Sequence, residues 1–249
     1  MWDGTVPPPP QGSVVKVRGL VQEYNGRLQL RIERMRASQP ADNVDLNRLV
    51  PCAPETPDAY RARIEYTIEC FQSEDLKKVV REMLRLAGDN LEWFPAAQRL
   101  HHAERTGLLH HTCSMLNTAE HIIQAYPFLH GDLLRAGVIL HDLSKITEMK
   151  SDELGNVTDY TREGLLIGHL VMGVAKLHEA AKNVGVTGEI VVLLEHMIIS
   201  HHGIPEYGSP MAPKFPEAEV LNTLDTLDAR LFEMDEALSR AMPGGFSEK

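Results

Sequence analysis

The sequence has few cysteines, no long hydrophobic run and no excess of positive charge. Its three cysteines, Cys52, Cys70 and Cys113, are scattered, so they predict neither a disulfide framework nor a paired metal motif. No run of about 18 apolar residues occurs, so no transmembrane helix is expected. The first residues also lack the basic and then apolar pattern of a secretory leader. We therefore expect a cytoplasmic protein with no membrane partner.

The formal charge is −10, whereas a protein that holds nucleic acid mainly through its overall charge is usually basic. Long-range attraction of a polyanion by the whole molecule is therefore not expected. The charge is uneven, however, because residues 1–40 contain six basic and three acidic side chains. The basic face of the first hairpin, with Arg27 and Arg31, is open to two interpretations: a contact with RNA or a solvated strand face.

The 249 residues, 43% of them hydrophobic, are enough for one sizeable core, or for one core with a small appendage. Two β-rich runs flank Asn25-Gly26, a dipeptide typical of a tight hairpin turn. Alternation after this turn places Leu28, Leu30 and Ile32 on one face of the second strand. Because a lone hairpin is marginal in water, it is expected to pack on the rest of the chain or on another copy, and a homo-oligomer is possible.

After a proline-containing loop, the sequence is helical. Thr56-Pro57-Asp58 is a typical helix start, and Ser73 begins a second helix that Gly88 ends. Five later stretches have amphipathic spacing: 106–125, 131–142, 163–184, 187–202 and 217–240. Leu154-Gly155-Asn156 predicts a turn or short hairpin between helices. The expected fold is mainly α, with a β element over 1–37, a linker over 38–56 and about seven helices over 57–249.

Candidate metal ligands are concentrated around His141-Asp142, which follows an apolar helix over 133–140. Neighbouring residues near a helix end differ by about 100° in direction, so this imidazole and this carboxylate can converge on one ion. Nitrogen and oxygen donors together suit Mn²⁺, Fe²⁺, Co²⁺, Ni²⁺ or Zn²⁺ better than Ca²⁺. Lys145 lies about one helical turn further on, where its ammonium group can reach a phosphate oxygen.

A His-Asp pair alone is weak evidence, but here it belongs to an ordered set. Histidines precede it by about thirty residues and follow it on two helical segments, and an aspartate lies on the last apolar helix. This order resembles the HD superfamily of metal-dependent phosphohydrolases. The resemblance implies a helical bundle that holds a metal ion with an upstream His, the His-Asp pair and a distal Asp.

The individual motifs are similar to those of the YhaM-type 3′–5′ exoribonucleases over residues 90–240. They are His101-His102-Ala103, Gly107-Leu108-Leu109-His110-His111-Thr112, Ala136-Gly137-Val138-Ile139-Leu140-His141-Asp142-Leu143-Ser144-Lys145, Gly168-His169, Ser200-His201-His202-Gly203 and Leu224-Asp225-Thr226-Leu227-Asp228-Ala229. The segment from Val14 to Arg36 resembles the last strands of the OB-fold that precedes the HD domain in that family. The implied domains are a partial OB-like element, a linker and an HD-type domain within the boundaries given above.

The resemblance implies specific roles for individual residues. His111, rather than His110, is the first ligand because it directly precedes Thr112, and Asp225 is the distal aspartate rather than Asp228. The downstream histidines, His169, His201 and His202, would complete a second ion site, and Asp142 would bridge the two ions. The full metal set is His111, His141, Asp142, His169, His201, His202 and Asp225. One or two ions are expected, with manganese favoured among the transition metals.

Catalysis is expected to use Asp142 for ligation and water orientation, and Lys145 to stabilise charge on phosphate oxygens. Lys145 and His102 are also the predicted substrate contacts. Asp228 is expected to orient the last helix or a histidine ligand.

Two other functions stay open. An OB barrel needs about five strands and only about two are evident, which favours a smaller substrate and hence a nucleotide phosphohydrolase. A nucleic-acid-binding module with a structural metal is a third reading. The leading expectation is a phosphodiesterase that acts on RNA or short oligonucleotides.

Overall fold

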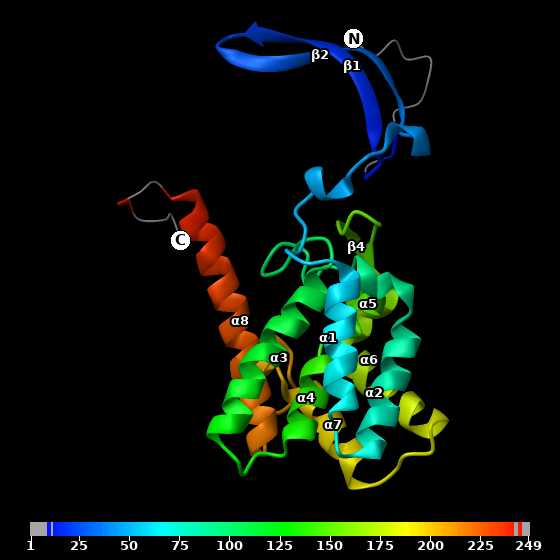
Figure 1. Cartoon of the computed structure of the whole chain (residues 1–249), viewed down its shortest axis with the longest axis vertical. Helices are drawn as coiled ribbons and strands as arrows, with labels where there is room; N and C mark the ends of the chain where they lie inside the picture. The colour runs from blue at the N-terminus through cyan, green and yellow to red at the C-terminus, as the bar shows by residue number, and fades with distance from the viewer. Residues whose placement is uncertain (1–8, 11, 242–243, 246–249) are drawn as a thin grey trace. The chain divides into compact units, whose positions relative to one another are not determined.

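The computed structural model describes residues 9–10, 12–241 and 244–245. By the contacts between residues, the chain divides into two units, Met1–Leu49 and Val50–Lys249, and each unit is described by itself. The fold is mainly helical with an N-terminal hairpin, as the sequence predicted (Figure 1). Among the described residues, no helix is both long enough and apolar enough to cross a membrane.

The first unit contains the antiparallel strands β1 (Val15–Tyr24) and β2 (Arg27–Ala37). Tyr24 pairs with Arg27, so Asn25 and Gly26 alone make the turn. Both have positive φ, 50° and 73°, which is the backbone that the Asn-Gly pair favours in a two-residue hairpin turn. The predicted hairpin and its turn are confirmed. Residues 1–8 and 11 of the predicted β element lie outside the described part of the chain.

The apolar face of this hairpin is open within the first unit. Leu28 is 78% exposed and Leu30 is 54% exposed. At the base of the hairpin, Asp42 forms ion pairs with Arg36 and Lys16, at 2.7 Å in each case. The hydrogen bonds from these two cations hold the pKa of Asp42 well below its usual range. Ion pairs thus stabilise the base of the hairpin, while the apolar side chains nearer the turn are not buried within their own unit.

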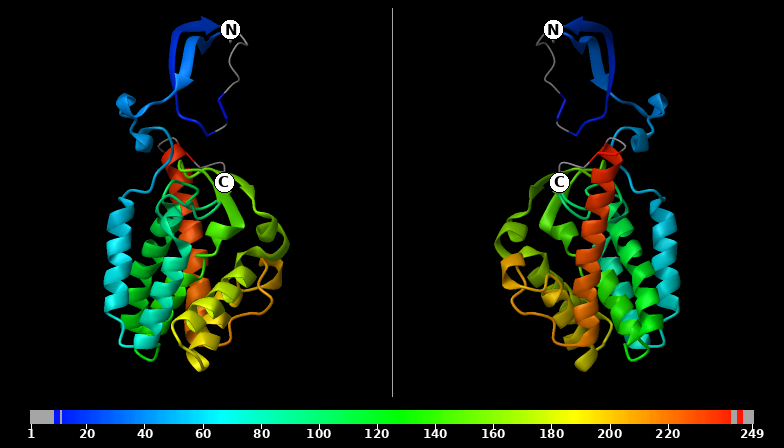
Figure 2. Two further views of the ribbon diagram at one scale, coloured as in Figure 1. Left: turned by 90° about the vertical axis from the view of Figure 1, so that its right-hand side faces the viewer. Right: turned by 90° about the vertical axis from the view of Figure 1, so that its left-hand side faces the viewer.

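The second unit contains eight helices in its described residues, of which seven are long. They are α1 (Pro57–Glu69), α2 (Glu74–Ala87), α3 (Gly107–Ala125), α4 (Gly131–Leu140), the four-residue α5 (Lys145–Glu148), α6 (Arg162–Asn183), α7 (Glu189–Ser200) and α8 (Pro216–Arg240). The short strands β3 (Met149–Ser151) and β4 (Val157–Tyr160) form the small hairpin predicted between helices. In Figure 2, α1, α3 and α8 run roughly lengthwise along this unit.

Local sequence explains where the first two helices begin and end. The Thr56 hydroxyl accepts a hydrogen bond from Ala59 N, and the Ser73 hydroxyl accepts one from Leu76 N. Each such cap is worth about 1 kcal/mol. Gly88 ends α2 with φ 70°. These three positions were read from the sequence and are confirmed.

Helix α4 lies at the centre of the unit and contacts α1, α2, α3, α7 and α8. Nearly all of its side chains are buried. Gly137 lets α7 approach closely, because a Cβ atom there would lie 2.2 Å from Met197 Cε. The C-terminal end of this buried helix places His141 and Asp142 in the interior of the second unit.

Candidate metal centre

The His-Asp pair follows the last residue of α4. His141 is fully buried and Asp142 is 2% exposed. Nε2 of His141 lies 3.3 Å from Oδ2 of Asp142, so the two side chains do converge on one point. Burial of a carboxylate beside an imidazole is costly unless both groups are paired or bind an ion.

His111 on α3 and Asp225 on α8 complete a first cluster around this point. His111 Nε2 lies 3.3 Å from His141 Nε2, 3.3 Å from Asp225 Oδ1 and 3.9 Å from Asp142 Oδ2. Transition metals bind nitrogen and oxygen donors at about 2.0–2.2 Å, which puts tetrahedral donors roughly 3.3 Å apart. We call these four residues the first ion site.

The other oxygen of Asp142 faces a second cluster. Asp142 Oδ1 lies 3.4 Å from His169 Nε2 and 3.5 Å from His201 Nε2. His202 joins them, since one donor atom from each of the four residues lies within 4.8 Å of the others. We call Asp142, His169, His201 and His202 the second ion site.

The five histidines of these sites are held in the same way. Each uses Nδ1 for a protein contact: His111 with Asp228, His141 with Val138 O, His169 with Glu148, His201 with Ile198 O and His202 with Tyr207 O. A carbonyl oxygen only accepts, so three of these contacts require a proton on Nδ1 and leave the lone pair on Nε2. The Nε2 atoms that face Asp142 are therefore oriented as metal ligands.

Unpartnered atoms also fit a bound cation. Asp142 Oδ1, His169 Nε2 and His201 Nε2 are buried and have no hydrogen-bond partner. Buried polar atoms nearly always have one, and here all three face one another. A divalent ion would satisfy them together, and the imidazole and carboxylate donors suit a transition metal. The buried cluster therefore implies a divalent metal.

The charges and pKa values of these side chains also suit a bound divalent metal. Burial opposes ionisation of Asp142, yet Lys145, His141 and His201 hold its pKa well below the usual range. Burial lowers the pKa of His111, but hydrogen bonds to Asp225 and Asp228 outweigh it and raise the pKa to about 9. The carboxylates are thus ionised at neutral pH, and a metal ion would displace the proton from His111 Nε2.

Lys145 and His102, the predicted substrate contacts, are both largely buried but have different neighbours. Lys145 Nζ is 2.7 Å from Asp142 Oδ2, so its ammonium group is beside the first ion site. His102 is 2% exposed, with Nε2 at 2.8 Å from Asp228 Oδ2 and Nδ1 at 3.2 Å from His110 Nδ1. The six other predicted ligands, by contrast, are gathered around the seventh, Asp142.

Two residues near the ions were not assigned from the sequence. Glu148 accepts hydrogen bonds from both the backbone N and Nδ1 of His169, each at 3.0 Å. His101 has a buried, unpartnered Nε2, and one of its ring nitrogens lies within 4.8 Å of ligand atoms of His111 and Asp225. Nothing in the local sequence distinguishes this glutamate from the other acidic residues. His101 stands in the quoted His101-His102 pair, where its neighbour was favoured instead.

Comparison with known proteins agrees with the geometry. The HD domain family model matches residues 108–230. The 3′–5′ exoribonuclease YhaM of Geobacillus sp. (strain WCH70) is 38% identical over 237 residues, which are 95% of this chain and 72% of the relative. The proteins of the same name from Shouchella clausii and Bacillus subtilis are 40% and 38% identical, again over 95% of this chain and over 73% and 74% of their own lengths. No solved structure matches the chain.

Proposed function

Because the chain belongs to the HD-domain family of the YhaM 3′–5′ exoribonucleases, we propose that it hydrolyses RNA from the 3′ end with divalent metal ions. The observation that carries the proposal is the convergence of six imidazole and carboxylate side chains on Asp142, which makes seven candidate ligands in all. A single structural ion would need only four of them. The extra donors favour a hydrolytic centre over a binding module with a structural metal.

The reaction needs a cation because the scissile phosphodiester is anionic. When bound, divalent ions offset that charge and make water a better nucleophile at neutral pH. Asp142 would hold both ions, one through each carboxylate oxygen, since Oδ2 faces the first ion site and Oδ1 the second. Lys145 would place its ammonium group against a phosphate oxygen and stabilise the charge that develops there.

His101 adds a neutral polar group at the first ion site. Burial, with a smaller effect of the neighbouring cations, lowers the pKa of His101 to about 4, so its ring is uncharged at neutral pH. Its Nε2 has no protein partner. We assign to it a hydrogen bond to the substrate phosphate.

Further assignments belong to the same proposal. Manganese is the ion that we favour around Asp142, among the transition metals that bind mixed imidazole and carboxylate donors. RNA is the favoured substrate because the relatives are exoribonucleases, and the scattered cysteines favour a cytoplasmic location. The open apolar face of the hairpin favours self-association.

The test is hydrolysis of a short RNA that carries a label at its 5′ end, in the presence of Mn²⁺. The proposal expects a ladder of labelled products that shorten from the 3′ end. A copy of the same RNA that carries its label at the 3′ end should release the label as a mononucleotide in the first cleavage. Internal cleavage, or hydrolysis of free nucleotides alone, would contradict the proposal.

Asp142→Asn tests the role of the metal centre. We expect activity to fall by more than about 100-fold, because loss of groups that merely support metal ligands costs 10–100-fold. Asp159→Asn is the matched control, since Asp159 is exposed on β4 and away from the ions. Equal activity of the two variants would show that Asp142 has no role in the reaction.

A further inference from the structure

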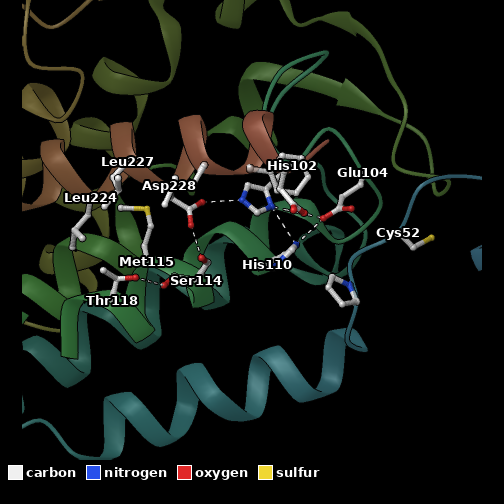
Figure 3. A pocket seen from close by; sticks show the side chains of 14 residues that line it. Cys52, His102, Glu104, His110, Ser114, Met115, Thr118, Leu224, Leu227 and Asp228 are labelled. Atoms are coloured by element: carbon white, nitrogen blue, oxygen red, sulfur yellow. Dashed lines mark hydrogen bonds and ion pairs between the residues drawn. The ribbon is translucent and has the colours of Figure 1, made fainter. Parts of the chain in front are cut away.

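A second group of metal-binding side chains lies outside the two ion sites. His102 and Glu104 precede α3, and His110 is on its first turn. Their donor atoms lie within 4.8 Å of one another. We call these three residues the outer cluster; Figure 3 shows them on the wall of a pocket.

The spacing of the outer cluster is that of a ligand set. Glu104 Oε1 is 2.7 Å from His110 Nδ1 and 3.7 Å from His102 Nδ1, and the two ring nitrogens are 3.2 Å apart. Tetrahedral donors around a transition metal are roughly 3.3 Å apart, and these three distances bracket that value. The spacing also resembles that of the first ion site, where the donors lie 3.3–3.9 Å apart.

The protonation of the rings is compatible with metal binding. Asp228 holds Nε2 of His102 at 2.8 Å, which leaves the lone pair on Nδ1 facing His110 and Glu104. Burial raises the pKa of Glu104, but hydrogen bonds with His102 and His110 lower it to about 2, so Glu104 is a carboxylate at neutral pH. The Nδ1 atoms of His102 and His110 therefore face each other and the carboxylate of Glu104.

The surroundings hold these groups in place while leaving access from outside. The ring of Phe232 lies 4.0 Å from the ring of His102, and Tyr60 stacks on His110 at 5.7 Å. All three residues of the outer cluster line a pocket of about 570 Å³. Water and small ions can reach the cluster through this pocket.

We propose that the outer cluster binds a divalent transition-metal ion of the Zn²⁺ class, in addition to the ions held around Asp142. Two imidazoles and one carboxylate form a three-ligand set that leaves one position for water, and such donors favour Zn²⁺, Co²⁺ or Ni²⁺ over Mg²⁺ and Ca²⁺. Without an ion, the same atoms would be a hydrogen-bonded trio in which Nδ1–H of His110 donates to the carboxylate of Glu104. The two states differ in the number of ions per chain.

Counting the ions bound per chain distinguishes a metal-bound outer cluster from a hydrogen-bonded one. Metal-free protein is saturated with Co²⁺, passed through a desalting column and analysed for cobalt per chain. We expect His110→Gln and Glu104→Gln to bind one ion fewer than the unchanged protein. His121→Gln is the matched control, because His121 is an exposed histidine further along the same helix, and it should bind the full number.

His102 is left unchanged in this test because it contacts Asp228, which also orients His111. Circular dichroism and thermal melting in chelator establish that each variant is folded. A second pair of variants isolates the outer cluster: Asp142→Asn should keep one Co²⁺ ion, and adding His110→Gln should remove it. Equal cobalt content in the folded His110→Gln, Glu104→Gln and unchanged proteins would overturn the proposal. No RNA is used, so the result is independent of the proposed activity.

Discussion

The carboxylate of Glu148 controls both the position and the proton of His169. One oxygen accepts hydrogen bonds from the backbone N and from Nδ1 of this residue. The Nδ1–H contact directs Nε2 toward Asp142 Oδ1, at 3.4 Å. Glu148 therefore supports the second ion site without touching an ion.

Replacing Glu148 by Ala should weaken the second ion site selectively. Loss of a group that orients a histidine ligand typically lowers metal affinity 10–100-fold, so we expect one of two Mn²⁺ dissociation constants to rise by that factor while the other stays the same. Calorimetric titration with Mn²⁺ measures both constants. Glu153→Ala is the control, because Glu153 is exposed in the β3–β4 turn. A uniform loss of affinity at both sites would show that Glu148 acts on the whole fold.

The cysteines should differ sharply in reactivity. Burial raises the pKa of Cys113 to about 12, so at pH 8 only roughly one thiol in ten thousand is ionised, and the side chain is fully enclosed. Cys70 is exposed. A colorimetric thiol reagent at pH 8 should modify Cys70 quickly and Cys113 only on unfolding. Cys70→Ser should remove the fast phase; a fast phase that persists in it and is lost in Cys113→Ser would contradict this.

Among the helices, α6 has an unusual break. Gly168 has φ 77° and ψ 157° inside it, so the helix consists of two segments that meet just before His169. Only glycine adopts this backbone readily, and other residues pay about 1–3 kcal/mol of strain. The break starts a new helical segment at His169 and leaves its backbone N–H free for Glu148.

Gly168→Ala should therefore lower both stability and metal affinity. We expect a loss of about 1–3 kcal/mol in the free energy of unfolding, together with weaker Mn²⁺ binding at the second ion site. Gly185→Ala is the matched control, since Gly185 also has positive φ, 71°, at the end of α6, with open space around it. It should lose stability while keeping its affinity for Mn²⁺. Unchanged metal binding in Gly168→Ala would show that His169 does not depend on the break.

Over the whole second unit, the metal centre joins helices that are far apart in sequence. Its ligands come from α3, the end of α4, α6, the end of α7 and α8. Without ions, the buried carboxylates and imidazoles lack part of their pairing. Bound ions should therefore stabilise the arrangement of these helices as well as supply chemistry.

Metal removal should lower the melting temperature. An ion present at 100 times its dissociation constant adds about 2.7 kcal/mol of stability. For a domain of this size that corresponds to roughly 5–10 °C in Tm. Thermal melting with and without a chelator measures the difference. Asp142→Asn, which lacks the shared ligand, should respond much less, and an equal response in both proteins would place the stabilising ion elsewhere.

The elements themselves follow largely from local sequence. Asn25-Gly26 predicted the hairpin turn, and Thr56 and Ser73 predicted the starts of α1 and α2. Apolar spacing predicted the later helices. These features could be predicted because turns, caps and amphipathic faces depend on residues only a few positions apart. The metal ligands were also proposed from sequence, as what the resemblance of the ordered motifs to the HD family implies. The break at Gly168 was missed, since a glycine before His169 is compatible with a continuous helix.

The sequence by itself determined the mainly helical fold, since caps, turns and apolar spacing are local, and the resemblance of its motifs to the HD family predicted which residues bind metal. Only the tertiary structure decided which atoms face one another. It placed Lys145 against Asp142, Asp228 behind His111 and Glu148 behind His169, and it gathered His102, Glu104 and His110 into the outer cluster. These pairings join side chains from separate helices, and their distances depend on how buried surfaces pack rather than on any local pattern.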